Sequence, residues 1–152
     1  MARYTTRIRS PHPPETAFAY LADLRNFADW DPGVRAVSQV AGEGGGPGGV
    51  FDVTVAGPGR DLTLRYRTME HDAPRRLLVV ARSAALTSTD LITIEPDGEG
   101  CAVTYDAELT LNGILRVGEL GLRLVFGRVG NRAAAGLRQA LQGSALHRSD
   151  VT

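Results

Sequence analysis

The strongest constraint on the fold is a change of hydrophobic period along the chain. Between residues 34 and 111, six segments alternate apolar and polar residues with a period of two, as strands with one buried face do. These segments are 34–41, 49–56, 61–71, 76–83, 86–95 and 101–111. Short stretches rich in Gly, Pro and Asp separate them. The pattern predicts an antiparallel meander.

Four further segments flank the meander. Residues 3–10 alternate like a strand, residues 15–24 place apolar side chains at helical spacing, and residues 26–30 predict a second short helix. Residues 116–142 predict one long helix with a single apolar stripe. The stripe consists of Leu122, Val125, Phe126, Val129, Ala133, Leu137 and Leu141.

These segments together predict an α+β domain in the order strand, two helices, six strands, helix. A sheet with one apolar face needs a cover, and only the long C-terminal helix is large enough to supply it. Because a strongly curved sheet cannot touch a straight helix along its whole length, we expect a cavity between the two. We expect a single ligand-binding domain over residues 1–143 and a flexible tail over residues 144–152.

Charge and motifs exclude several classes of function. The 17 basic residues are all arginine and are balanced by 17 acidic residues, so a general electrostatic grip on nucleic acid or an anionic membrane is not expected. The N-terminus lacks the apolar segment of a signal peptide, and no apolar run is long enough to span a membrane, which favours a cytoplasmic protein. A single cysteine and three scattered histidines predict no metal site, and we expect no cofactor. The glycine-rich run at 42–49 has no lysine and predicts a hairpin connection, not a phosphate-binding loop.

Three segments of the chain carry a family pattern. They are PETAFAYLAD at 14–23, NFADWDPGV at 26–34 and IEPDGEGCAVTY at 94–105, where Cys101 stands at a position usually held by threonine. They resemble the opening helix, the exit into the next strand and a late hairpin of the START-like helix-grip superfamily (SRPBCC), in particular its bacterial polyketide cyclase/dehydrase branch. The resemblance implies a seven-stranded helix-grip fold with a ligand cavity. It leaves catalysis open, because the superfamily contains enzymes, lipid carriers, receptors and co-chaperones without a shared catalytic motif.

Strand alternation predicts which side chains face the cavity. The inner face of 86–95 contains Ser88 and Asp90, and that of 101–111 contains Tyr105. In 76–83 both faces are apolar, so the direction of Arg82 stays open. The predicted ligand-binding residues are Trp30, Phe51, Val53, Leu64, Tyr66, Arg82, Ser88, Asp90, Ile92, Tyr105, Leu109, Asn112, Leu120 and Leu124.

Asp90 is the most informative of these candidates, because a carboxylate on an apolar face is costly unless it is paired or hydrogen-bonded. One interpretation makes it a polar anchor or a proton-transfer group, with Tyr66 and Tyr105 as possible catalytic partners. The alternative places it at a strand end near solvent or pairs it with Arg82. His71 precedes a turn, so we expect it to be exposed.

Three functions are compatible with the sequence. The first is binding of a hydrophobic, polyketide-like or lipid-like molecule between the sheet and the C-terminal helix. The second is a cofactor-free polyketide cyclase or dehydratase that uses polar cavity residues for proton transfer. The third is a protein-interaction module. The exposed edge strands also make a homodimer a reasonable expectation.

Overall fold

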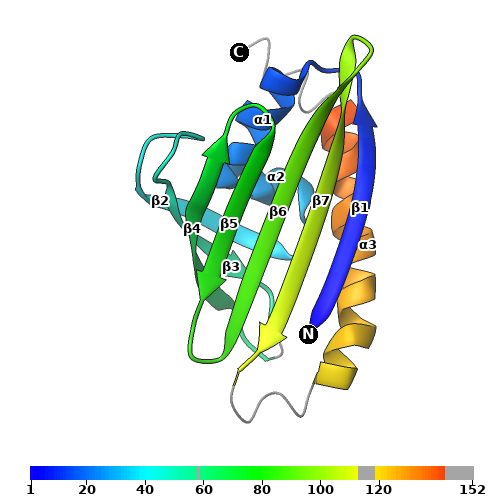
Figure 1. Cartoon of the computed structure of the whole chain (residues 1–152). Helices are drawn as coiled ribbons and strands as arrows, with labels where there is room; N and C mark the ends of the chain where they lie inside the picture. Colours follow the sequence, from blue (N-terminus) through cyan, green and yellow to red (C-terminus); the bar gives the residue numbers. More distant parts are fainter. Residues whose placement is uncertain (58, 113–118, 143–152) are drawn as a thin grey trace.

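The computed structural model describes residues 1–57, 59–112 and 119–142, with backbone only at 119–125 and 142. The start of the predicted long helix and the expected tail lie outside these residues. The seven strands form one antiparallel sheet in the order β1-β7-β6-β5-β4-β3-β2 (Figure 1). Their bounds are β1 Ala2–Ser10, β2 Val34–Ala41, β3 Val50–Val55, β4 Leu62–Asp72, β5 Arg76–Arg82, β6 Leu86–Asp97 and β7 Gly100–Leu111.

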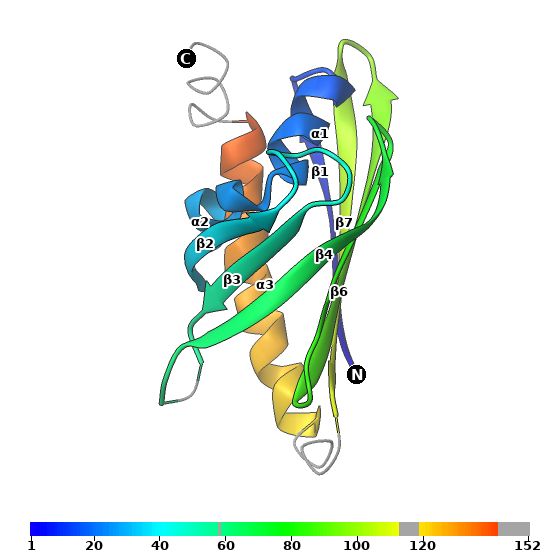
Figure 2. The same cartoon turned by 90° about the vertical axis from the view of Figure 1, so that its left-hand side faces the viewer.

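The helices lie on the inner face of this curved sheet. They are α1 Pro14–Ala22, the 3₁₀ turn η1 Leu24–Asn26, α2 Phe27–Trp30 and the long C-terminal helix α3 Glu119–Gln142. Figure 2 shows the sheet curling so that β2 and β3 pass across α3, while α1 lies at one end. The expected helix-grip arrangement is therefore confirmed. No helix in the described part of the chain is long and apolar enough to cross a membrane.

The pairing of β5 and β6 decides which side chains point inward. β6 pairs with both neighbours without a register shift, so Ser88 and Asp90 face the helices as alternation predicts. In β5 the buried core residues are Leu77, Val79 and Ala81. Arg82 is one position out of phase with them and is exposed, so it neither pairs with Asp90 nor points into the interior.

A register shift in β4 overturns the expectation for His71. The pairing of β4 with β5 is regular up to Thr68 and resumes at Glu70, which leaves Met69 as an extra, exposed residue. Such a bulge moves every later side chain to the opposite face. His71 is accordingly half-buried, contacts the ring of Phe18 edge-on, and hydrogen-bonds through Nε2 to the Gly45 carbonyl oxygen at 2.7 Å.

Two glycines of α3 allow it to approach the rest of the molecule very closely. A Cβ at Gly130 would overlap the ring of Tyr4 on β1, and a Cβ at Gly136 would overlap the carbonyl oxygen of Trp30 at the end of α2. These close approaches hold α3 against β1 and α2. Towards its C-terminal end, Leu137, Ala140 and Leu141 are buried in the apolar core that also contains α1 and the inner face of the sheet.

Candidate functional site

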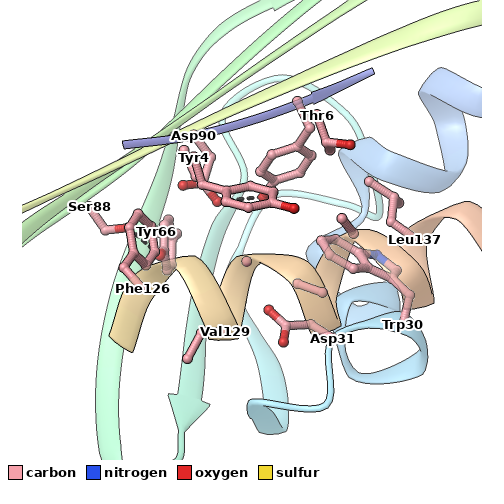
Figure 3. A pocket seen from close by; sticks show the side chains of 15 residues that line it. Tyr4, Thr6, Trp30, Asp31, Tyr66, Ser88, Asp90, Phe126, Val129 and Leu137 are labelled. Atoms are coloured by element: carbon pink, nitrogen blue, oxygen red, sulfur yellow. Dashed lines mark hydrogen bonds between the residues drawn. The ribbon is translucent and has the colours of Figure 1, made fainter. Parts of the chain in front are cut away.

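A cavity of about 130 Å³ lies between α3 and the inner face of the sheet (Figure 3). Strands β1, β4, β6 and β7 form one wall, α3 forms the other, and the end of α2 closes one side. The lining residues are Tyr4, Thr6, Trp30, Asp31, Tyr66, Ser88, Asp90, Tyr105, Ala107, Phe126, Val129, Gly130, Ala133, Ala134 and Leu137. An engineered apolar cavity of about 150 Å³ is enough for benzene, so this one has room for about one ring.

The cavity exists because the helix presents small residues to it. Gly130, Ala133 and Ala134 line the helical wall, and none of them reaches far towards the strands. The close contacts of Gly130 with Tyr4 and of Gly136 with Trp30 set the distance of α3 from β1 and from α2. A helix with larger residues at these positions would fill the same space with its own side chains.

Asp90 supplies the buried carboxyl group of the sheet wall. It is 7% exposed and accepts a hydrogen bond at Oδ2 from the Tyr105 hydroxyl at 2.5 Å. Burial raises the pKa of Asp90 to about 7, although the hydrogen bond from Tyr105 lowers it in part and the charge of Asp31 raises it further. Burial and the neighbouring carboxylate raise the pKa of Tyr105 well above its usual value. The Tyr105 hydroxyl therefore stays protonated near neutral pH and donates the hydrogen bond of this pair.

Two other tyrosines at the cavity also have their hydroxyl protons engaged. The Tyr66 hydroxyl donates to Ser88 Oγ at 2.8 Å, and the Tyr4 hydroxyl donates to Asn131 Oδ1 on α3 at 2.7 Å. Burial raises the pKa of Tyr66 as well. These bonds link β4 to β6 and β1 to α3, so they hold the walls of the cavity together.

Trp30 and Asp31 form the end wall next to α2. The Trp30 ring meets Tyr105 edge-on, with ring centroids 5.7 Å apart, and its buried Nε1 has no hydrogen-bond partner among the described residues. The indole thus both packs on the core and lines the cavity. Asp31 accepts the backbone N–H of Gly33 at Oδ1, 2.8 Å away. Its pKa is raised because burial outweighs this hydrogen bond.

The predicted site residues divide into three groups. Trp30, Tyr66, Ser88, Asp90 and Tyr105 line the cavity. Others do not line the cavity. Phe51, Val53, Leu64 and Ile92 point inward but are packed in the closed core, and Leu109 is half-buried beyond the cavity. Arg82 is exposed, and Asn112 donates to the Ser83 carbonyl oxygen at the end of the sheet. The side chains of Leu120 and Leu124 lie outside the described residues.

Several lining residues were not among the predicted site residues. Tyr4 and Thr6 lie on the inner side of the first strand, and four others belong to α3 positions whose helical pattern was visible: Phe126, Val129, Ala133 and Leu137. Their periodicity could have identified them. Asp31 could not be identified in this way, because it lies in the turn after α2, where neither helical nor strand periodicity predicts the direction of a side chain.

The site offers no ready set of metal ligands. Across the described ranges, no group of three or more His, Cys, Asp or Glu side chains is close enough to hold an ion. Cys101 is fully buried, and burial raises the pKa of its thiol, so it is not poised as a nucleophile. The chemistry that these residues could perform is hydrogen bonding and movement of a single proton.

The fold and its interior cavity define a helix-grip protein of the START type. The family described as "Polyketide cyclase / dehydrase and lipid transport" matches residues 1–142, and the chain belongs to this family. By sequence alone, no curated protein matches the chain significantly.

Solved structures of similar fold cover nearly the whole chain. A START superfamily protein from Mycobacterium smegmatis has a TM-score of 0.76 and 12% identity, with 100% of both chains covered. The Zhui aromatase/cyclase from a Streptomyces species has a TM-score of 0.73 and 14% identity, covering 97% of this chain and 93% of its own. A Thermus thermophilus protein, TTHA0849, has a TM-score of 0.71 and 20% identity, covering 92% of this chain and 95% of its own. At these identities the likeness establishes the fold.

Proposed function

We propose that this protein binds a small, mostly apolar molecule in the cavity between the sheet and α3, with Asp90 as its polar anchor. The observation that carries the proposal is an apolar cavity of about 130 Å³ with a buried carboxylate in its wall. Pockets for drug-sized ligands occupy roughly 300–1,000 Å³. The ligand, or the part of it that enters, is therefore about one ring in size. Family membership supports ligand binding in general.

Toluene tests the cavity without requiring any polar contact. We expect it to bind the protein and to shift NMR signals of cavity residues such as Ala107 and Leu137, which line opposite walls. Replacing Ala134 by leucine should abolish the binding, since three added carbon atoms fill the space. Ala135→Leu is the matched control, because Ala135 is the next residue of the same helix and is exposed.

The thermal unfolding of both variants shows whether they remain folded. Toluene binding that survives in a folded Ala134→Leu variant would contradict the location of the site. Failure of the wild-type protein to bind toluene or any other one-ring compound would refute the proposal itself.

The Asp90–Tyr105 pair favours a second function, a cofactor-free polyketide cyclase or dehydratase. A carboxyl group with a pKa of about 7 is matched to acid–base work near neutral pH, because both of its protonation states are populated there. Asp90 would move the proton, and Tyr66 and Tyr105 would orient the reacting group. The structural neighbours include the Zhui aromatase/cyclase, which supports this alternative at the level of the fold.

If the protein is such an enzyme, Asp90→Asn should lower turnover of an aromatic-polyketide substrate at least tenfold. Tyr66→Phe and Tyr105→Phe should have effects of similar size. The pH–rate profile of the wild type should bend near pH 7 and lose that bend in Asp90→Asn. Tyr20→Phe is the control, because the buried Tyr20 hydroxyl has no hydrogen-bond partner among the described residues and does not line the cavity. Unchanged turnover in all three cavity variants would remove these residues from the mechanism.

The protein-interaction alternative has less support. It requires a contiguous exposed apolar patch. The exposed large apolar side chains of the described residues are Met1, Val40, Met69 and Val129, which come from different elements. A cytoplasmic location and a homodimer through the edge strands β1 and β2 stay predictions.

A further inference from the structure

The hydrogen bonds at the cavity leave acceptors and few donors. The hydroxyl protons of Tyr4, Tyr66 and Tyr105 are already donated to Asn131, Ser88 and Asp90. Within the described part of the chain, Asp90 Oδ1 and Asp31 Oδ2 receive no hydrogen bond, because the bonds to these carboxyl groups end on Oδ2 and Oδ1 respectively. Neither oxygen is fully buried, so each is accessible to a ligand that supplies a donor.

The charged side chains that line the cavity in the described residues are both acidic. Asp31 from the end of α2 and Asp90 from β6 both line it, and no arginine, lysine or histidine is among the described residues that line it. The groups that face Asp90 from the other strands are Tyr66 and Tyr105, and the described α3 side chains at the cavity are uncharged. The charge of Asp31 raises the cost of ionising Asp90, and no basic side chain among the described lining residues offsets it. A bound cation would offset it.

The remaining walls also suit a cation. Among the described residues, five aromatic side chains line the cavity, from β1, α2, β4, β7 and α3: Tyr4, Trp30, Tyr66, Tyr105 and Phe126. Aromatic faces attract ammonium groups, and the attraction is stronger where water is excluded. The cavity also has uncharged donors, namely the unpartnered Trp30 Nε1 and the hydroxyl groups of Thr6 and Ser88, but an uncharged donor does not balance the charge of a carboxylate.

We propose that the preferred ligand of this cavity is a small apolar amine in its protonated form. Its ammonium group lies between Asp90 and Asp31, and its one-ring body lies against the small residues of α3. An ammonium group has three donors for the two free carboxylate oxygens, whereas a carboxylic acid anion meets two like charges. This inference rests on the proposed ligand-binding function and adds the charge class of the ligand.

Three compounds that share one ring and differ in charge test the inference: benzylamine, benzyl alcohol and benzoate. Calorimetric titration of the intact protein at pH 8, where benzylamine is still protonated, should show it binding at least tenfold more tightly than benzyl alcohol. Benzoate should not bind measurably. Lowering the pH to 5.5 should weaken benzylamine binding and leave benzyl alcohol binding nearly unchanged, since Asp90 then takes up a proton.

Variants of the two aspartates separate the contribution of their charge to benzylamine binding from that of the shape of the cavity. Asp90→Asn should remove most of the tenfold preference for benzylamine, and Asp31→Asn should reduce it, while binding of benzyl alcohol persists in both. Glu99→Gln is the control, because Glu99 is an exposed residue of the β6–β7 turn. Binding of benzoate or benzyl alcohol as tightly as benzylamine would overturn the inference, and so would an undiminished preference in folded Asp90→Asn.

The outcomes also distinguish this inference from the function on which it rests. If toluene and benzyl alcohol bind and are excluded by Ala134→Leu, but benzylamine gains nothing, the cavity binds ligands and only the charge class is wrong. If none of the four compounds binds the wild-type protein, both the proposed function and the inference fail.

Discussion

Replacing Asp90 by asparagine should raise the free energy of unfolding at pH 8 by up to about 4 kcal/mol. Asp90 has a pKa of about 7 in the folded protein, against an ordinary value of 3.8. Between these two values the folded state holds a proton that the unfolded state has released, so stability falls as the pH rises through this window. Each pH unit contributes about 1.4 kcal/mol, and the asparagine variant escapes this loss.

Urea unfolding at pH 4, 6 and 8 measures the effect. The wild type should lose stability across this series relative to Asp90→Asn, and the difference between the two should grow with pH. The raised pKa of Asp31 also makes the wild type less stable as the pH rises. The effect of Asp90 is therefore read from the difference in unfolding free energy between the wild type and Asp90→Asn at each pH. Carboxylates with lowered pKa, such as Asp52 beside Arg65, lose their contribution only at lower pH. If the stability of Asp90→Asn changed with pH in parallel with the wild type, Asp90 would have an ordinary pKa and the prediction would be wrong. The control variant Glu99→Gln should show a pH dependence parallel to that of the wild type.

Gly136→Ala should cost about 3 kcal/mol or more of stability. The added methyl group would overlap the carbonyl oxygen of Trp30, which is a backbone atom and cannot rotate away. The helix must then move off α2, which also displaces Trp30 from the cavity wall. Overpacking of this kind typically costs about 1–3 kcal/mol, and contact with rigid backbone places this case at or above the upper end.

The same helix supplies a matched control for this prediction. A Cβ at Gly127 meets nothing within 4 Å, so Gly127→Ala should keep the structure and gain roughly 0.5–1 kcal/mol from higher helix propensity. Thermal unfolding of the two variants should therefore shift in opposite directions from the wild type. Equal shifts would mean that α3 does not approach Trp30 as closely as described.

Alternation along the strands was sufficient to place Asp90 and Tyr105. Both lie on strands whose pairing is regular over its whole length, so a period of two identifies the inner face without error. The expectation that His71 is exposed, made from its place before a turn, was wrong, because the extra residue at Met69 in β4 reverses the two faces and no local feature of the sequence marks it. A repeat pattern carries no information about where the register slips.

It was harder to predict which inward-facing residues reach the cavity than to predict which residues face inward. Phe51, Val53 and Ile92 point inward as expected, yet they are packed in the closed core, because the inner face extends well beyond the cavity. The limits of the cavity depend on where α3 lies, which the close contacts of Gly130 and Gly136 determine. Those contacts join residues more than 100 positions apart, and the pattern of a single chain does not reveal them.

The pairing of β1 with β7 has a consequence for how the chain acquires its structure. Ala2 lies opposite Leu109 and Ser10 opposite Cys101, so partners in this ladder are 107 and 91 residues apart. The strands from β2 to β7 each pair with their sequence neighbour and can form as local hairpins. During synthesis, β1 must wait as an unpaired segment until β7 has emerged, and α3, which packs on β1, can dock only after that. We therefore expect the cavity to be the last part of the molecule to form, and premature arrest of the chain to leave an open sheet that cannot retain a ligand.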